Sequence, residues 1–221
     1  MHVVNRRVWF FLTILSVFLF SGSLLKWIPI APTEVLGFVS GAVCVLFVVD
    51  QNIWNFPVGI ANNIFFIILF LSSRLYGDMA LQGVYIILGF MGWWQWIYGG
   101  ANRTALHVRR ASIGELIVLG GIGAVATIGL QNHFVSIHDA APFLDAVTTV
   151  LSLVAQYLLN GKRLENWFVW IIADVLYIGM YIQKELYLTA LLYAVFIGMC
   201  IAGLASWKKA EQNRATKGSI Q

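Results

Sequence analysis

Eight long apolar stretches dominate this 221-residue chain and leave few residues for a water-facing surface. An α-helix crosses the hydrocarbon layer of a membrane in about 20 residues, and each stretch is long enough, or nearly so, to do this. The polar remainder, 207–221, is expected to be a frayed tail. The sequence therefore predicts an all-α membrane protein, with spans at approximately 8–25, 34–49, 53–72, 78–98, 113–130, 142–160, 166–183 and 186–206.

The composition agrees with this prediction. Of the residues, 60% are hydrophobic and 11% are charged, whereas ordinary soluble domains carry about 25% charged residues. That excludes a secreted domain, a cytosolic enzyme and a nucleic-acid binder, and makes the lipid bilayer the main partner. Cys44 and Cys200 both lie inside apolar stretches, so we interpret them as packing residues and not as a disulfide or a metal pair.

The basic residues predict the orientation of the spans. Loops rich in Lys and Arg stay on the cytoplasmic side. With both termini cytoplasmic, the outer side holds only Lys26, Arg74 and Lys184. The inner side holds the other 11 of the 14 basic residues: Arg6, Arg7, Arg103, Arg109, Arg110, Lys162, Arg163, Lys208, Lys209, Arg214 and Lys217.

The first apolar stretch, 8–25, follows Arg6 and Arg7 and in this respect looks like a signal peptide. It is longer than the usual apolar region of such a peptide, and no small-x-small cleavage site follows it. We therefore expect a retained helix. Its removal would leave seven spans with the same orientation.

An internal repeat is visible when the chain is compared with itself at an offset of 111 residues. Residues 34–96 then align with 145–207 without a gap, with 13 identities in 63 positions. Each copy holds three spans, and the odd span between them makes the copies enter the membrane in the same sense. This predicts parallel repeats with a site at their interface near the midplane. The most informative matches are Asn55/Asn166, Tyr76/Tyr187, Gly92/Gly203 and Trp96/Trp207, with Asn63/Asp174 as a similar pair.

The domain boundaries follow from this repeat. The parts are an extra N-terminal helix (1–30), a first three-helix repeat (31–100), a linker helix with its loops (101–140), a second three-helix repeat (141–207) and a polar cytoplasmic tail (208–221).

An ionisable residue, Asp174, stands halfway along the stretch 166–183. An ionised side chain at the centre of a membrane helix costs about 2.5–3.5 kcal/mol on insertion scales, so such residues mark functional sites. Trp167, Trp170, Tyr177 and Tyr181 lie with it on one helical face, because their spacing alternates between three and four residues. For Trp167 and Tyr181, near the ends, helix packing or an interfacial belt is the alternative. Trp170, Asp174 and Tyr177 favour a cavity wall.

Three other stretches carry matching polar or aromatic faces. Each could be a contact between helices, because Asn, Gln, Ser and Thr hydrogen-bond across membrane helices. Four helices with such faces and few charges predict instead a ligand-filled interior. Trp and Tyr faces stack on flat rings and attract cations, which predicts a small, flat, polyhydroxylated solute that can carry a positive charge. The additional residues are Asn62 and Asn63 on 53–72, Gln82, Trp93 and Trp96 on 78–98, and Gln156 on 142–160.

Motifs for catalysis are missing from the sequence. There is no phosphate-binding Gly-Lys-Ser/Thr loop, no H-E-x-x-H and no G-x-S-x-G. His133, His138 and Asp139 fall together in an outer loop, where a solvated loop is a better interpretation than a metal site. We therefore expect no enzyme, no catalytic residue, no metal and no cofactor.

Two Trp-rich motifs resemble the signatures of the PnuC family of vitamin transporters. The first is Gly92-Trp93-Trp94-Gln95-Trp96, and the second is Glu165-Asn166-Trp167-Phe168-Val169-Trp170 followed by Asp174. Asn55, the stretch 59–62 and Gln82 support the resemblance, which covers roughly 30–207. Where this chain has Asp174, Asn is common in the family.

The resemblance implies a SWEET-like 3+1+3 parallel-repeat helix bundle with one extra N-terminal helix, assembled as a homotrimer in the bacterial inner membrane. It implies facilitated diffusion of nicotinamide riboside, which a cytosolic kinase traps by phosphorylation. Relatives that carry thiamine or riboflavin are alternatives, as is a non-transporting membrane scaffold or receptor. The implied substrate-binding residues, together with those from the faces above, are Asn62, Asn63, Gln82, Trp93, Trp96, Gln156, Asn166, Trp167, Trp170, Asp174 and Tyr177.

Overall fold

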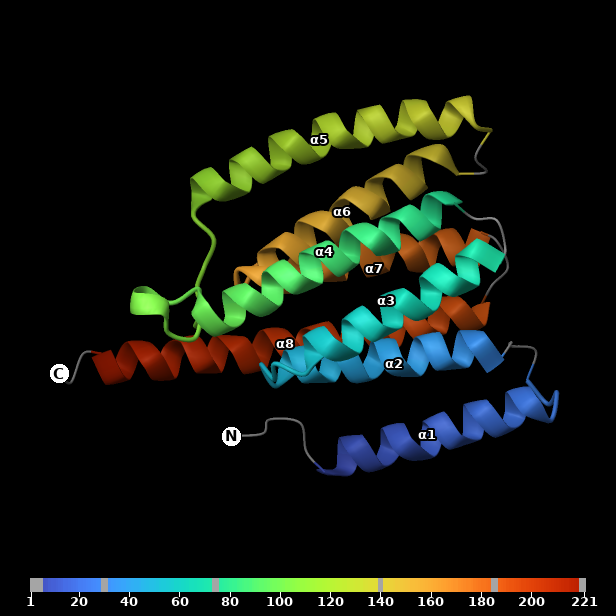
Figure 1. The fold of residues 1–221 in the computed structure, drawn as a ribbon, viewed down its shortest axis with the longest axis horizontal. Coiled ribbons are helices and arrows are strands. Elements are labelled where there is room, and N and C mark those ends of the chain that lie inside the picture. The colour runs from blue at the N-terminus through green and yellow to red at the C-terminus, as the bar shows by residue number, and fades with distance from the viewer. Residues whose placement is uncertain (1–5, 29–31, 73–75, 139–140, 184–186, 219–221) are drawn as a thin grey trace. The chain divides into compact units, whose positions relative to one another are not determined.

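The computed structural model describes residues 6–28, 32–72, 76–138, 141–183 and 187–218, and almost all of them are helical (Figure 1). In these residues there is no strand, only an isolated bridge between Arg109 and Arg163. The all-α prediction is confirmed. The helices are α1 (Arg6–Leu24), α2 (Pro32–Val49), α3 (Asn55–Ser72), α4 (Tyr76–Tyr98), α5 (Ile113–Ser136), α6 (Pro142–Asn160), α7 (Asn166–Gln183) and α8 (Tyr187–Gly218), with a short 3-10 helix at Ala101–Arg103.

The helix ends follow local signals in the sequence. Ser112 caps α5, because its side chain accepts a hydrogen bond from the backbone N–H of Glu115, the arrangement that Ser-x-x-Glu favours. Pro142 begins α6 at a position where a missing N–H costs nothing. Helices α6 and α7 coincide with the predicted spans, and the other helices begin within two residues of them.

Two C-terminal helix ends differ from the expectation. Helix α5 continues to Ser136, six residues beyond the predicted end of its span, and α8 continues to Gly218. The expectation of a frayed tail from residue 207 is therefore wrong. Residues 208–217 contain good helix formers and no Pro or Gly. Glu211 also makes a 2.9 Å ion pair with Arg110, which precedes α5.

Two of the helices, α5 and α6, are long and apolar enough on their own to span a membrane, judged over the described residues. No residue in the apolar part of α5 is fully buried, whereas 39% of that of α6 is buried. Shorter apolar helical segments occur at Leu12–Leu24, Val35–Val49 and Asn55–Ile68. Arg74 and Lys184, expected on the outer side, lie outside the described residues.

The chain divides into two compact units, residues 1–93 and 94–221, which we describe one at a time. In unit 1, α2 packs on α3 and α1 packs on α2. The ring of Phe66 lies against Gly37, where a Cβ atom would be 2.4 Å from it, so α2 and α3 approach closely. The buried side chains of this unit include Val35, Ala42, Leu46, Val49, Phe56 and Ile60.

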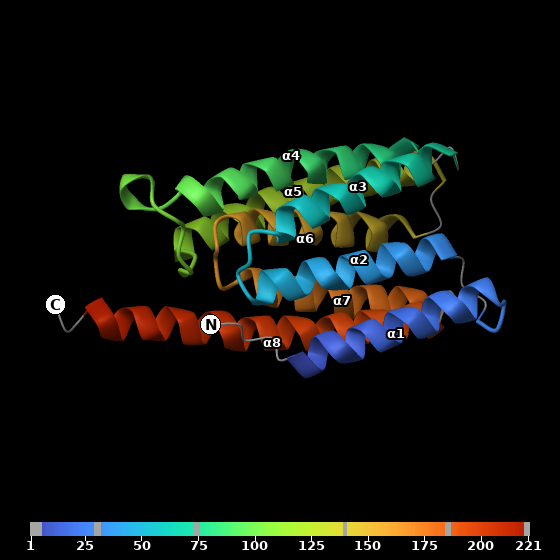
Figure 2. The same cartoon turned by 60° about the horizontal axis from the view of Figure 1, so that its bottom comes forward.

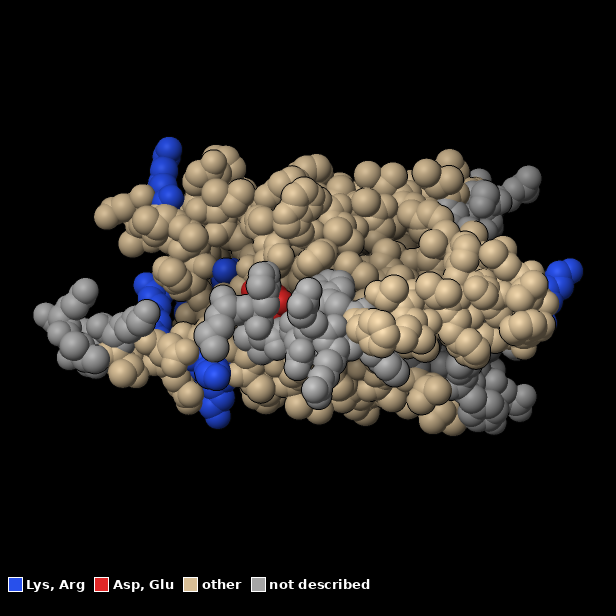
Figure 3. Space-filling view, turned by 90° about the horizontal axis from the view of Figure 1, so that it is seen from below, with Lys and Arg blue, Asp and Glu red and all other residues tan. Residues whose placement is uncertain are grey.

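In unit 2, α6 lies between α5 and α7, and α7 packs on α8 (Figures 1 and 2). Its core side chains include Ala146, Val150, Ala155, Leu158, Ala173 and Cys200. On the face shown in Figure 3, most of the visible Lys and Arg side chains lie toward the end at which α8 finishes. Within unit 2, Arg110 is paired with Glu211 of α8.

The turn between α2 and α3 has the same backbone as the turn between α6 and α7. Six backbone hydrogen bonds recur at an offset of 111 residues, among them Asn52 N–H to the Phe47 carbonyl and Arg163 N–H to the Leu158 carbonyl, both 2.8 Å. Gln51 and Lys162, again 111 apart, are left-handed, with φ of 54° and 47°. Both turns are Schellman motifs, and their agreement is what a duplicated three-helix unit would produce.

Candidate functional site

The start of α7 fixes the position of its aromatic face. The side-chain amide of Asn166 donates to the carbonyl of Arg163 at 2.5 Å and closes the turn. Asn166 and Trp167 are almost fully buried there. Two of their atoms, Asn166 Oδ1 and Trp167 Nε1, have no hydrogen-bond partner in the described part of the chain. Buried polar atoms of this kind usually find a partner, so these two atoms are available to water or to a ligand that reaches them.

Three tryptophans form a packed cluster in unit 2. The ring of Trp207 meets Trp167 edge to face at 5.4 Å and Trp96 at 6.0 Å. Trp96, Trp167 and Trp207 are 3%, 1% and 0% exposed, and Trp96 Nε1 donates to the Leu159 carbonyl at 3.2 Å. Protein atoms therefore cover Trp96 and Trp167, two of the predicted binding residues, in this conformation. Ligand stacking on either would require the cluster to open.

Two further features hold this cluster in place. Gly203 faces the Trp167 ring so closely that a Cβ atom would be 2.4 Å from it. The ammonium of Lys162 lies 4.2 Å from the centre of the Trp96 ring, a distance at which a cation is attracted to the ring face. This attraction requires the charged ammonium. Burial disfavours the charged form and lowers the pKa of Lys162 to about 8.

The middle of α7 places Asp174 against α8. Asp174 is 5% exposed, and its Oδ2 atom accepts from the Cys200 thiol at 3.8 Å. Trp170, one turn before it, is half-buried. An acid at this depth in an apolar helix is rare unless it serves a ligand or a proton. Asp174 and Trp170 thus combine a buried acid with a partly accessible ring on one helix.

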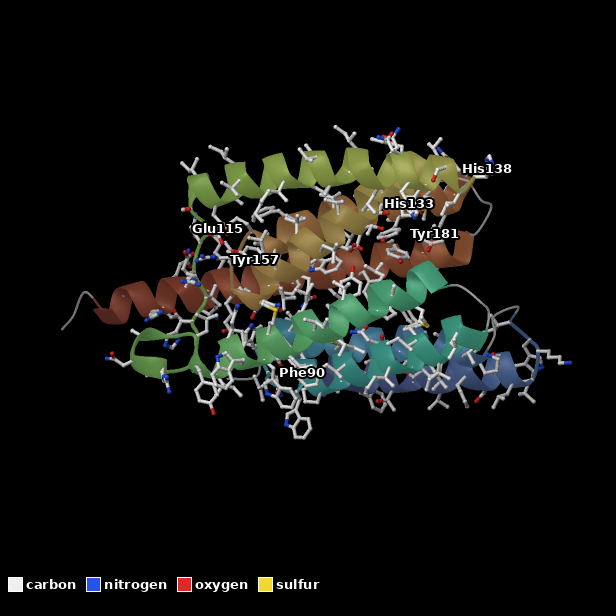
Figure 4. All side chains as sticks on the ribbon, turned by 45° about the horizontal axis from the view of Figure 1, so that its top comes forward. Phe90, Glu115, His133, His138, Tyr157 and Tyr181 are labelled. Carbon is white, nitrogen blue, oxygen red and sulfur yellow. The ribbon has the colours of Figure 1, made fainter. Side chains whose placement is uncertain are left out.

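A tyrosine cluster continues the same face beyond Asp174. The ring centre of Tyr193 of α8 lies 4.8 Å from that of Tyr177 and 5.3 Å from that of Tyr181. Its ring also contacts Phe196 edge to face. Figure 4 labels Tyr181, which comes from α7. Sequence analysis identified Tyr177 and Tyr181 but missed Tyr193. The signal was available, because Tyr193 is the repeat counterpart of Gln82, a predicted site residue.

The polar residues of α6 bond mainly within their own helix. The amide of Gln156 donates to Asn160 Oδ1 at 2.9 Å, and the hydroxyl of Thr148 donates to the Leu144 carbonyl at 2.8 Å. Gln156 is half-buried and Ser152 is buried. Gln156 and Thr148 are therefore hydrogen-bonded within α6, which lowers the cost of placing them inside a bundle.

Unit 1 contains four of the predicted binding residues, and one of them is hydrogen-bonded to α2. The Asn62 side chain donates to the Gly37 carbonyl at 3.2 Å and to the Ser40 hydroxyl. Asn63 and Gln82 are half-buried. Trp93 is also half-buried and is stacked on Phe90 with ring centres 6.5 Å apart. Asn62 is thus bonded to α2, but like Asn63, Gln82 and Trp93 it is half-buried and keeps accessible surface.

Comparison with known proteins gives a consistent result. The profile of a family described as nicotinamide mononucleotide transporters matches residues 31–209. The nicotinamide riboside transporter PnuC of Escherichia coli (strain K12) is 24% identical over 87% of this chain and 90% of its own length. The corresponding protein of Neisseria mucosa is 26% identical over 77% of this chain and 70% of its own length.

A relative with a different printed substrate is the riboflavin/roseoflavin transporter RibM of Streptomyces davaonensis. It is 23% identical over 79% of this chain and 84% of its own length. Among solved structures, a crystal structure of the vitamin B3 transporter PnuC has a TM-score of 0.68 with 21% identity, covering 92% of each chain. That likeness establishes the fold.

Proposed function

Because this chain belongs to the nicotinamide mononucleotide transporter family, a family of bacterial inner-membrane transporters and not of enzymes, we propose that it carries nicotinamide riboside. The observation that supports this most is the family match over residues 31–209 together with relatives that are named nicotinamide riboside transporters. Nicotinamide riboside is flat, ribosylated and cationic, which suits a path with aromatic rings and one acid.

The proposed contacts follow from which predicted residues keep accessible surface. Trp93 and Trp170 are half-buried and would stack on the pyridinium ring. Asp174 would offset its charge. The amides of Asn62, Asn63, Gln82 and Gln156 would bind the carboxamide and ribose, and Tyr177 would extend the ring contacts. Trp96, Asn166 and Trp167, which are buried, would contact the solute in a conformation in which the tryptophan cluster has opened. Asp174 is buried as well, so its contact also requires a rearrangement.

We further propose a uniport mechanism with alternating access, both termini cytoplasmic, and trapping of the solute by phosphorylation after entry. No nucleotide-binding motif occurs in the sequence, and the single acid at mid-helix offers no relay for a proton. A homotrimer, implied by the family resemblance, is proposed as well. The exposed apolar surface of α5 is compatible with such an assembly and with lipid.

Counterflow in proteoliposomes tests the transport proposal. Labelled nicotinamide riboside should accumulate in vesicles preloaded with the unlabelled compound, without ATP or an imposed ion gradient. Ligand-induced stabilisation without counterflow would instead favour a non-transporting receptor. Riboflavin and thiamine are run in parallel, because the RibM relative makes riboflavin the second candidate. Preferred counterflow of riboflavin would overturn the substrate assignment and leave transport intact.

Trp170→Ala tests the stacking contact. Loss of a stacked ring should weaken binding of nicotinamide riboside by about 1–3 kcal/mol, measured by titration of the purified protein. Trp94→Ala is the matched control, since Trp94 is 65% exposed and is not among the proposed contacts. An unchanged affinity in Trp170→Ala would make that residue a packing element.

A further inference from the structure

A small cavity lies in unit 2, beside the turn that joins α6 to α7. Its volume is about 160 Å³. It is smaller than the pockets of roughly 300–1,000 Å³ that enclose a whole organic ligand, but it has room for about five waters, at about 30 Å³ each, or for one compact ion. The residues that line it are Gln95, Gly99, Leu106, Arg109, Glu115, Tyr157, Gly161 and Arg163.

Backbone hydrogen bonds build the walls of this cavity. The N–H of Arg109 donates to the Lys162 carbonyl at 3.0 Å, and the N–H of Leu164 donates back to the Arg109 carbonyl at 2.9 Å. The segment is also tied to the end of α4, because Leu106 N–H donates to the Trp96 carbonyl at 3.0 Å. Figure 4 labels Glu115 and Tyr157, which reach this region from α5 and α6. The cavity is thus part of the fold.

The charges in the cavity do not balance. Glu115 is paired with Arg163, with 2.9 Å between Oε2 and the nearer guanidinium nitrogen. Arg109 shares the cavity and uses its Nε atom to donate to the Gly161 carbonyl at 3.3 Å, which leaves its two terminal nitrogens free of partners among the described residues. Partial burial, and after it the neighbouring charge of Arg163, lower the pKa of Arg109, while the carboxylate of Glu115 opposes this shift.

We propose that this cavity binds a phosphate dianion, either free or as the phosphate group of a phosphomonoester. The terminal nitrogens of Arg109 form a planar fork that matches two phosphate oxygens. Tyr157 and Gln95 also line the cavity, and they carry a hydroxyl and an amide. Glu115 does not repel the anion strongly, because Arg163 neutralises it. The volume accepts a phosphate group and leaves any larger part of the ligand outside.

The site is separate from the residues proposed to bind the transported solute, and it does not depend on what that solute is.

The test uses the full chain in nanodiscs of zwitterionic lipid, titrated with inorganic phosphate at constant ionic strength. Binding is measured by calorimetry. Arg109→Gln should weaken phosphate binding about tenfold or more, because a hydrogen bond to a charged group is lost. Arg109→Lys keeps the charge but not the fork and should be intermediate.

Arg214→Gln is the matched control, since Arg214 is exposed on α8 and does not line the cavity. It removes the same charge and should bind phosphate as the unchanged protein does. The melting temperature of each variant without phosphate establishes that it is folded. No phosphate binding by the unchanged protein, or equal losses in Arg109→Gln and Arg214→Gln, would overturn the site.

Two competition arms identify the source of the phosphate group. Nicotinamide mononucleotide should displace phosphate where nicotinamide riboside does not, which would support a soluble phosphomonoester. Displacement by phosphatidic acid added to the nanodiscs, whose headgroup is a phosphomonoester, would support the same site with a lipid headgroup as its occupant. Displacement by nicotinamide riboside at the same concentration as the mononucleotide would contradict recognition through the phosphate group.

Discussion

The α2–α3 turn of unit 1 and the α6–α7 turn of unit 2 share a backbone but differ in side chains. Gln51 occupies the left-handed position in the first turn and Lys162 in the second. Phe56 in unit 1 corresponds to Trp167 in unit 2, and Asn63 corresponds to Asp174. The larger ring, the cation and the acid all occur in the second copy. The comparison shows that the same turn can end a helix while the side chains around it differ.

The largest loss of stability should come from Gly203→Ala, because the Trp167 ring, which corresponds to the smaller Phe56 of unit 1, packs against Gly203. Gly203→Ala places a Cβ atom 2.4 Å from the Trp167 ring, which is buried and in contact with Trp207. Overpacking of this kind should cost about 1–3 kcal/mol, seen as a lower melting temperature. Gly198→Ala on the same helix is the control: nothing lies within 4 Å of its Cβ position, so it should be neutral or slightly stabilising. Equal melting temperatures for both variants would contradict the tight fit.

The next effect concerns the acid that distinguishes unit 2. Asp174→Asn gives this position the residue type of its counterpart Asn63. If the carboxylate offsets the charge of the solute, the KM for uptake should rise about tenfold, which corresponds to about 1.4 kcal/mol. Cys200→Ala is the control, because it removes the 3.8 Å contact with Asp174 and keeps the acid. Similar KM values for the two variants would show that the charge is not used.

The smallest effect at neutral pH concerns the left-handed position of the turn, because this contribution develops only as the pH rises above about 8. The pKa of Lys162 is lowered by burial to about 8, whereas an unfolded lysine titrates near about 10.4. Between these pH values the unfolded chain binds a proton that the folded chain has lost, so this residue makes folding more favourable as the pH rises. Lys162→Gln copies unit 1 and should remove that contribution. Its melting temperature should fall relative to the unchanged protein as the pH increases from 8 to 10.

Lys208→Gln provides the comparison for this pH series, since Lys208 is exposed on α8. Its melting curve should follow that of the unchanged protein across the same range. Parallel curves for Lys162→Gln and the unchanged protein would mean that the lysine keeps its proton. Attraction to the Trp96 ring, 4.2 Å away, would then outweigh burial.

Much of the fold could be predicted from the sequence because each helix carries its own signals. The apolar stretches located all eight helices, and α6 and α7 fall on their predicted residues. The tail was the exception. Its polar residues were interpreted as unfolded because polarity was given more weight than helix propensity, whereas Arg110 supplies a tertiary ion pair to Glu211.

The candidate site was predictable only in part. The spacing placed Trp167, Trp170 and Asp174 on one face of α7, but spacing does not say what covers each ring. The structure shows that Trp207 covers Trp167, while Trp170 keeps accessible surface. Tyr193 was missed because it belongs to another helix, although the repeat offset relates it to Gln82.

The sequence by itself determined where the helices lie, that they suit a membrane, and that a segment of three spans recurs after 111 residues. These properties depend on residues close together in the chain, through hydrophobicity, capping and backbone preference. Only the tertiary structure decided that Lys162 lies over Trp96 and that Arg109 shares a cavity with the Glu115–Arg163 pair. Such contacts join residues tens of positions apart. Their distances depend on how helices and loops pack, which hydropathy and spacing do not specify.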